Sequence, residues 1–154
     1  MIIKSRSKPV TTVHTVPSPP VPAEGAGVLS DETLDRFCQP LTSAELDSLR
    51  RQVEVHDRQP DGHVCLMEPL QSFELAVDFL RLYREQHFPH RGAQPTEEQL
   101  ASLQAQIRLV VECLADLVST MKSEGLHPVD LIVVLSQLRQ QASAGRGTQQ
   151  GAST

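Results

Sequence analysis

The sequence predicts an all-α protein, a small bundle of four to five helices that ends in an αα-hairpin, with disordered N- and C-terminal tails. Three observations support this prediction: capping boxes precede two segments, apolar residues recur at helical spacing, and Pro or Gly clusters separate the periodic stretches. The 154 residues allow one domain with tails. The longest unbroken apolar run, residues 131–135, is far shorter than the roughly 20 residues of a membrane span, so no membrane association is predicted.

The two ends of the chain differ in composition from the middle. Residues 1–29 hold five of the eleven prolines and also Gly25 and Gly27, a composition that cannot build a hydrophobic core. We therefore expect a disordered, Pro-rich and basic leader over 1–29, which serves either as a linker or as a ligand for a groove that binds polyproline. Residues 143–154 are mostly Gly, Ser, Thr, Ala and Gln and predict a disordered tail, which leaves 30–142 as the helical domain.

Two short helices are expected first. Acidic residues ahead of Leu34 and Phe37 predict a helix over about 31–38, which ends near a proline. A capping box that begins at Thr42 predicts the next helix, over about 43–57, before a Pro-Asp-Gly sequence breaks the chain.

A third helix is predicted over about 69–87 and is apolar on two faces. One face carries apolar residues at positions 70, 73, 77 and 80, and the second face carries Leu75, Phe79 and Leu82. Because a helix with two apolar faces is normally buried between neighbours, we expect this helix to lie centrally in the bundle.

The clearest periodicity follows a second capping box, at Thr96 and Gln99, and predicts a helix over about 97–123. Its apolar positions alternate at spacings of three and four, which is the seam of a coiled coil or of a helical bundle. Gly125 is expected to end this helix in the left-handed conformation, and Pro128 to open a last helix over about 128–142. The short connection makes the two helices an αα-hairpin.

The seam is the basis of the functional prediction. It packs either inside the chain or against another chain, and the two alternatives stay open at this point. We predict a non-enzymatic protein–protein interaction module, an adaptor or accessory subunit, that binds a protein partner or itself through the 97–142 hairpin. The residues expected to carry this association are Leu103, Ile107, Val110, Leu114, Leu117, Leu131 and Leu135.

Charge limits the other classes of partner. Residues 30–142 contain 10 basic and 18 acidic side chains, a net charge of −8, and would repel a phosphate backbone. We do not expect nucleic-acid binding by this core. The alternative function is a small dimeric nucleic-acid-associated regulator that uses the basic arm formed by Lys4, Arg6 and Lys8.

No motif predicts catalysis, and we expect no catalytic residue, no cofactor and no metal ligand. Six residues have the side chains that zinc prefers, but no Cys-x-x-Cys or Cys-x-x-His pair occurs among them: Cys38, His56, His63, Cys65, His87 and His90. A zinc-stabilised fold or a zinc-dependent enzyme is therefore only a third possibility. Three cysteines without repeated spacing and a start without an apolar signal segment predict a cytoplasmic protein with free thiols.

The segment from Gly125 through Pro128, Leu131, Val134 and Leu135 to residue 139 resembles the last turn and helix of the small Mozart proteins that associate with γ-tubulin complexes. The resemblance covers 15 of the 154 residues and does not extend to the remainder of the chain. It implies a small helical hairpin that is held by a larger partner.

Overall fold

The computed structural model describes residues 31–88 and 95–144, and these residues form five α-helices and no strand. The helices are α1 (Asp31–Cys38), α2 (Ser43–Asp57), α3 (Met67–His87), α4 (Glu97–Ser123) and α5 (Val129–Ala144). The all-α prediction is confirmed. The predicted disordered leader over 1–29 lies outside the described residues, as does the predicted tail except for positions 143 and 144, which end α5.

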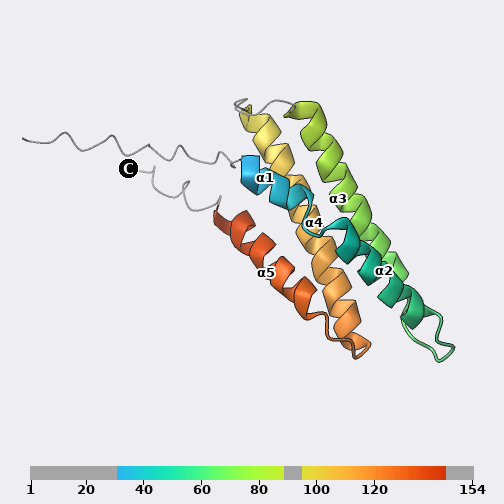
Figure 1. The fold of residues 1–154 in the computed structure, drawn as a ribbon. Helices are drawn as coiled ribbons and strands as arrows, with labels where there is room; N and C mark the ends of the chain where they lie inside the picture. Colours follow the sequence, from blue (N-terminus) through green and yellow to red (C-terminus); the bar gives the residue numbers. More distant parts are fainter. Residues whose placement is uncertain (1–30, 89–94, 145–154) are drawn as a thin grey trace, which may run out of the picture.

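The helices are arranged as four antiparallel rods (Figure 1). α1 and α2 run in the same direction and form one rod that is interrupted at residues 39–42, and α3, α4 and α5 then alternate in direction. The largest interface joins α3 to α4; α5 packs on α4, while α1 and α2 pack on α3. This is the up-and-down order of a four-helix bundle with a broken first rod.

Local sequence signals explain most helix boundaries. Both capping boxes form: Thr42 accepts a hydrogen bond from the backbone N–H of Glu45, and Thr96 accepts one from that of Gln99. The side chains of Glu45 and Gln99 each accept the return bond from the threonine N–H. α2 and α4 consequently begin at the predicted residues, and the predicted bounds of α1 and the predicted ends of α2 and α4 are also confirmed.

The αα-hairpin is also confirmed, and its turn has a defined geometry. Gly125 has a φ of 77°, and its N–H donates to the Lys122 carbonyl at 3.0 Å. The N–H of Leu126 donates to the Met121 carbonyl at 3.0 Å, which completes a Schellman motif. α5 begins at position 129 rather than 128, because the Pro128 carbonyl accepts the first helical bond from outside the helix.

The start of α3 differs from the prediction for a non-local reason. The helix begins at Met67, two residues earlier than expected, although its N-terminus has no capping side chain of its own. The carboxylate of Asp57, at the end of α2, accepts the N–H groups of Leu66 and Met67, both at 2.9 Å. The Asp57 side chain, which belongs to the preceding helix, therefore caps the N-terminus of α3.

α3 has one buried and one exposed apolar face. Leu70, Phe73 and Leu80 are fully buried, whereas Leu75 and Phe79 are each 56% exposed and Leu82 is 46% exposed. The expectation that both faces would be covered is wrong. α1, α2 and α4 all pack against the other side of α3, and no described helix covers the second face.

Ion pairs hold the interrupted first rod on α3. Arg84 pairs with Asp35 of α1, and Arg50 of α2 places one guanidinium nitrogen 2.8 Å from each carboxylate oxygen of Glu74. Together with the buried side chains of α1 and α2, these pairs set the position of the rod.

Among the described helices, none combines the length and the apolar character that crossing a membrane requires.

Candidate functional site

The seven residues predicted to carry association lie in the interior of the single chain. None is more than 6% exposed: Leu103, Ile107, Val110, Leu114, Leu117, Leu131 and Leu135. They pack α4 against its neighbours in one continuous core. A partner cannot reach these side chains unless the bundle opens. Their arrangement agrees with a seam that packs inside one chain and not against a second chain.

The outer side of the hairpin offers fewer apolar side chains. Leu109 of α4 is 46% exposed, and Val129 and Val133 of α5 are 62% and 50% exposed. The two valines are four residues apart and share one face of α5, whereas Leu109 belongs to the other helix. Whether the hairpin contacts a partner stays a prediction, and these three residues are the ones that would do so.

The exposed face of α3 has the most continuous apolar row. Leu75, Phe79 and Leu82, here called the α3 stripe, follow each other at spacings of four and three and so form a line along one helix face. The line spans about 10 Å of helix. The sequence pattern contained this row, but periodicity alone did not indicate that it faces solvent.

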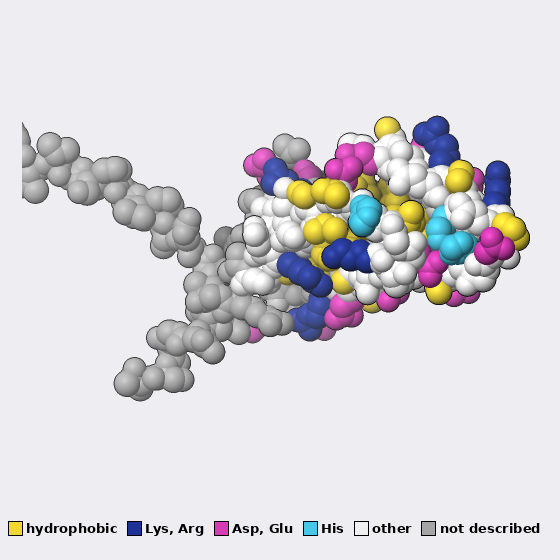
Figure 2. Space-filling view, turned by 90° about the horizontal axis from the view of Figure 1, so that it is seen from below, with side chains coloured by type: hydrophobic (Ala, Val, Ile, Leu, Met, Phe, Trp, Pro, Cys, Tyr) yellow, Lys and Arg dark blue, Asp and Glu magenta, His cyan; other side chains and the backbone are white. Residues whose placement is uncertain are grey.

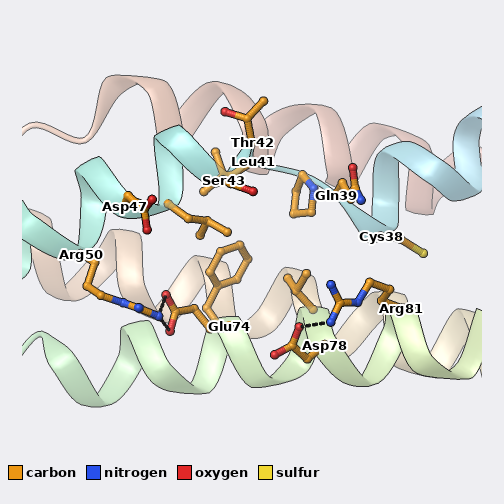
Figure 3. Close-up of a pocket in the computed structure, with 14 residues that line it drawn as sticks. Cys38, Gln39, Leu41, Thr42, Ser43, Asp47, Arg50, Glu74, Asp78 and Arg81 are labelled. Carbon is orange, nitrogen blue, oxygen red and sulfur yellow. Dashed lines mark hydrogen bonds and ion pairs between the residues drawn. The ribbon is translucent and has the colours of Figure 1, made fainter.

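A pocket of about 320 Å³ lies where α1 ends and α2 begins, above α3 (Figure 3). Its guanidinium groups already have carboxylate partners: Arg50 binds Glu74, and Arg81 lies 3.2 Å from Asp78. Because these charges are neutralised within the chain, the pocket is poorly suited to an anionic ligand. Burial raises the pKa of the Cys38 thiol beside it to about 11, so this cysteine stays protonated and is no nucleophile at neutral pH.

A groove of about 340 Å³ separates α2 from the start of α5. Leu49, Met121 and Leu131 form part of its apolar lining, and Glu45 and Asp130 supply acidic groups. On the face seen from below in Figure 2, hydrophobic side chains lie among polar and charged ones. The lining of the groove contains no pair of groups arranged for acid–base chemistry.

Three ionisable side chains from separate segments meet at one end of the bundle. Nδ1 of His63 lies 2.9 Å from Oε2 of Glu124, and Nε2 of His56 lies 3.4 Å from the same oxygen. His56 ends the buried face of α2, His63 belongs to the loop before α3, and Glu124 is the C-cap of α4. In Figure 2, histidine side chains lie next to acidic ones at this end of the molecule.

Asp57 lies next to this cluster and contacts His56 and Cys65. Its Oδ1 lies 3.0 Å from Nδ1 of His56, and the Sγ of Cys65 donates to its Oδ2 at 3.4 Å. Burial acts to raise the pKa of Asp57, but the hydrogen bonds from Leu66, His56, Met67 and Cys65 outweigh it, and the pKa lies below its ordinary value. The pKa of Glu124 is lowered too, chiefly by the hydrogen bond with His63. Both carboxylates are therefore ionised at neutral pH.

The other residues of zinc-binding type do not join the cluster. Cys38 is buried at the end of α1 and Cys113 is half-buried on α4. His87 stacks near the ring of Tyr83 at the far end of α3, with 4.4 Å between centroids. His90 and the basic arm of Lys4, Arg6 and Lys8 lie outside the described residues. Glu124 was not among the candidates, because nothing near it in the sequence connects it to a histidine 61 positions away.

No protein-family model matches the chain, and neither a curated protein nor a solved structure gives a match. The similarity of residues 125–139 to the Mozart proteins therefore stays a resemblance of one segment.

Proposed function

We propose that this protein is a non-enzymatic association module, a cytoplasmic adaptor or accessory subunit, which binds an amphipathic helix of a partner protein on the α3 stripe. One observation supports this most strongly: Leu75, Phe79 and Leu82 are about half exposed in a continuous line. Exposed apolar residues scattered singly need no explanation, but a row of three large ones on a rigid helix is typical of a contact surface.

The energy available from this row suits a reversible contact. Fully burying one Leu or Phe contributes about 1.5 to 3 kcal/mol, so covering the exposed half of three such side chains contributes roughly 2 to 5 kcal/mol. A partner helix that presents its own apolar residues at positions i, i+4 and i+7 would match the spacing of the stripe.

The charges beside the stripe favour a basic partner. Glu85 is exposed and lies along one edge of the stripe, where Asp78 is already paired with Arg81 at 3.2 Å. The helical domain as a whole is acidic. A second copy of the chain would bring a domain of the same net negative charge to this face, which is unfavourable. We therefore assign the surface to another protein, with Lys or Arg flanking its apolar face.

In this proposal the hairpin is the scaffold rather than the contact surface. The α4 seam holds the bundle together, and the bundle presents α3 with one face bare. Association through the hairpin itself would instead use Leu109, Val129 and Val133, which the experiment below separates from the α3 stripe.

The test uses two synthetic helices that share one leucine face, with either Lys or Glu on the polar face. Each is titrated into isotope-labelled protein, and the shifts of the backbone amides are mapped. We expect the Leu/Lys helix to shift amides around the α3 stripe at concentrations of about a millimolar, and the Leu/Glu helix to bind at least about tenfold more weakly. Phe79→Glu should abolish the shifts, while the matched control Val133→Glu should leave them unchanged.

Two results would overturn the proposal. The first is a set of shifts confined to residues around Val133 that is lost in Val133→Glu and kept in Phe79→Glu. This result would assign the binding surface to the hairpin. A concentration-dependent dimer in light scattering that Phe79→Glu dissociates would assign the α3 stripe to a second copy of the chain.

A further inference from the structure

The cluster of His56, His63 and Glu124 has the spacing of a metal site. Its three ligand atoms all lie within 4.8 Å of one another. In a tetrahedral zinc site with bonds of 2.0 to 2.1 Å, two ligand atoms are about 3.4 Å apart. The separations from Oε2 of Glu124, 3.4 Å to His56 and 2.9 Å to His63, are close to this value.

Nε2 of the buried His56 lies 3.4 Å from the Glu124 carboxylate and makes no hydrogen bond to it. The His56 side chain is only 8% exposed, and its Nε2 makes no hydrogen bond within the described part of the chain. Buried polar atoms are nearly always paired, so an unpaired imidazole nitrogen that faces a carboxylate needs an explanation. A cation between Nε2 and Glu124 would satisfy both groups.

The hydrogen bond on the second ring nitrogen of His56 also resembles that of a metal-binding histidine. Asp57 binds Nδ1 of His56, which fixes the ring and leaves Nε2 free to coordinate. The carboxylate is itself held by the N–H groups of Leu66 and Met67. Histidines that bind metals commonly have such a carboxylate on the second nitrogen, and this arrangement makes the imidazole a stronger ligand.

We propose that His56, His63 and Glu124 bind one Zn²⁺ ion. Two imidazoles and one carboxylate form a ligand set that suits zinc. Among the described residues no fourth side chain joins the set, which leaves the remaining position to water. The His63 side chain is 35% exposed, so an ion has a path from solvent.

The bound ion would join three segments at one end of the bundle. It would connect the end of α2, the loop before α3 and the C-cap of α4, where the Schellman turn begins. Because an ion that binds only the folded state stabilises it by mass action, zinc should raise the melting temperature. This site is separate from the α3 stripe and does not depend on the function proposed for it.

The experiment uses full-length protein without an affinity tag, freed of metal with a chelator. Zinc binding is measured by calorimetry, stoichiometry by elemental analysis, and coordination by the visible spectrum with Co²⁺. The variants are His63→Ala and Glu124→Gln, because removing the buried His56 could prevent folding. His127→Ala, an exposed histidine in the α4–α5 turn, is the matched control.

We expect one Zn²⁺ per chain, a Tm rise of about 5 °C or more in excess zinc, and the strong visible absorption of four-coordinate Co²⁺. His63→Ala and Glu124→Gln should each weaken binding at least about tenfold, and His127→Ala should not. The proposal is wrong if the wild-type protein retains no zinc and shows no Tm change, or if folded His63→Ala binds zinc as tightly as wild type.

Discussion

The seam of α4 and the stripe of α3 have the same kind of sequence pattern and opposite environments. Both are rows of large apolar residues at spacings of three and four. The seam residue Leu114 is fully buried, whereas Phe79 in the stripe is 56% exposed. α4 has a packed helix on each side of its apolar face, α3 and α5, while all described neighbours of α3 lie on one side of it. The pattern identifies residues suited to burial, and the number of packed neighbours decides which are buried.

This difference divides the molecule into a part that holds the fold and a part available to a partner. Removing a seam residue should affect stability first, because its contacts are internal. Removing a stripe residue should affect binding and leave the fold intact. The following predictions test this division, beginning with the largest effect.

Leu114→Glu should unfold the protein. A charged side chain at a fully buried position leaves a carboxylate in the core, and the cost rivals the whole stability of a small domain, about 5 to 15 kcal/mol. Phe79→Glu, the matched change at an exposed site, should alter the free energy of unfolding by no more than about 0.5 kcal/mol. Circular dichroism during urea unfolding measures both. A Leu114→Glu protein that stays helical and merely dissociates would show that the seam joins two chains.

Asp57→Asn should have an intermediate effect. The substitution removes one of the two carboxylate oxygens that hold the N–H groups of Leu66 and Met67 at the start of α3. Leaving such a group unpaired costs about 1 to 3 kcal/mol. Asp61→Asn, at an exposed loop position, is the control and should be neutral. Equal stability of the two variants would show that the capping of α3 by α2 contributes nothing.

The pH dependence should be the smallest of the three effects. The pKa values of Asp57 and Glu124 lie below their ordinary values of 3.8 and 4.5. As the pH falls past the ordinary values, the unfolded chain takes up protons before the folded one does, so the contribution of these carboxylates to stability is lost. Urea unfolding between about pH 6 and pH 3 should show this decline. The double variant Asp57→Asn, Glu124→Gln should show a shallower one, and an unchanged slope would contradict the assignment.

Features set by neighbouring residues were predictable from the sequence. The capping boxes at Thr42 and Thr96 and the left-handed Gly125 form as expected, because each depends on side chains or backbone within a few positions. The helix ends that these features govern were therefore predicted correctly.

Features set by distant residues were not predictable. α3 starts early because Asp57 supplies acceptors nine and ten positions away. His56 and His63 were recognised as zinc-type residues, but the carboxylate that meets them, Glu124, comes from another helix. The exposure of the α3 stripe depends on which side of α3 the first rod occupies, and no periodicity within α3 contains that information.

The central claim is that the seam is internal and the α3 stripe is open to solvent, and leucine methyl groups report on both at once. Methyl relaxation measured with a soluble gadolinium chelate tests it most directly. The methyls of Leu75 and Leu82 should relax strongly, and those of Leu103, Leu114 and Leu117 should be protected at every protein concentration. Strong relaxation of the seam methyls in dilute protein, with protection appearing only on concentration, would contradict the account.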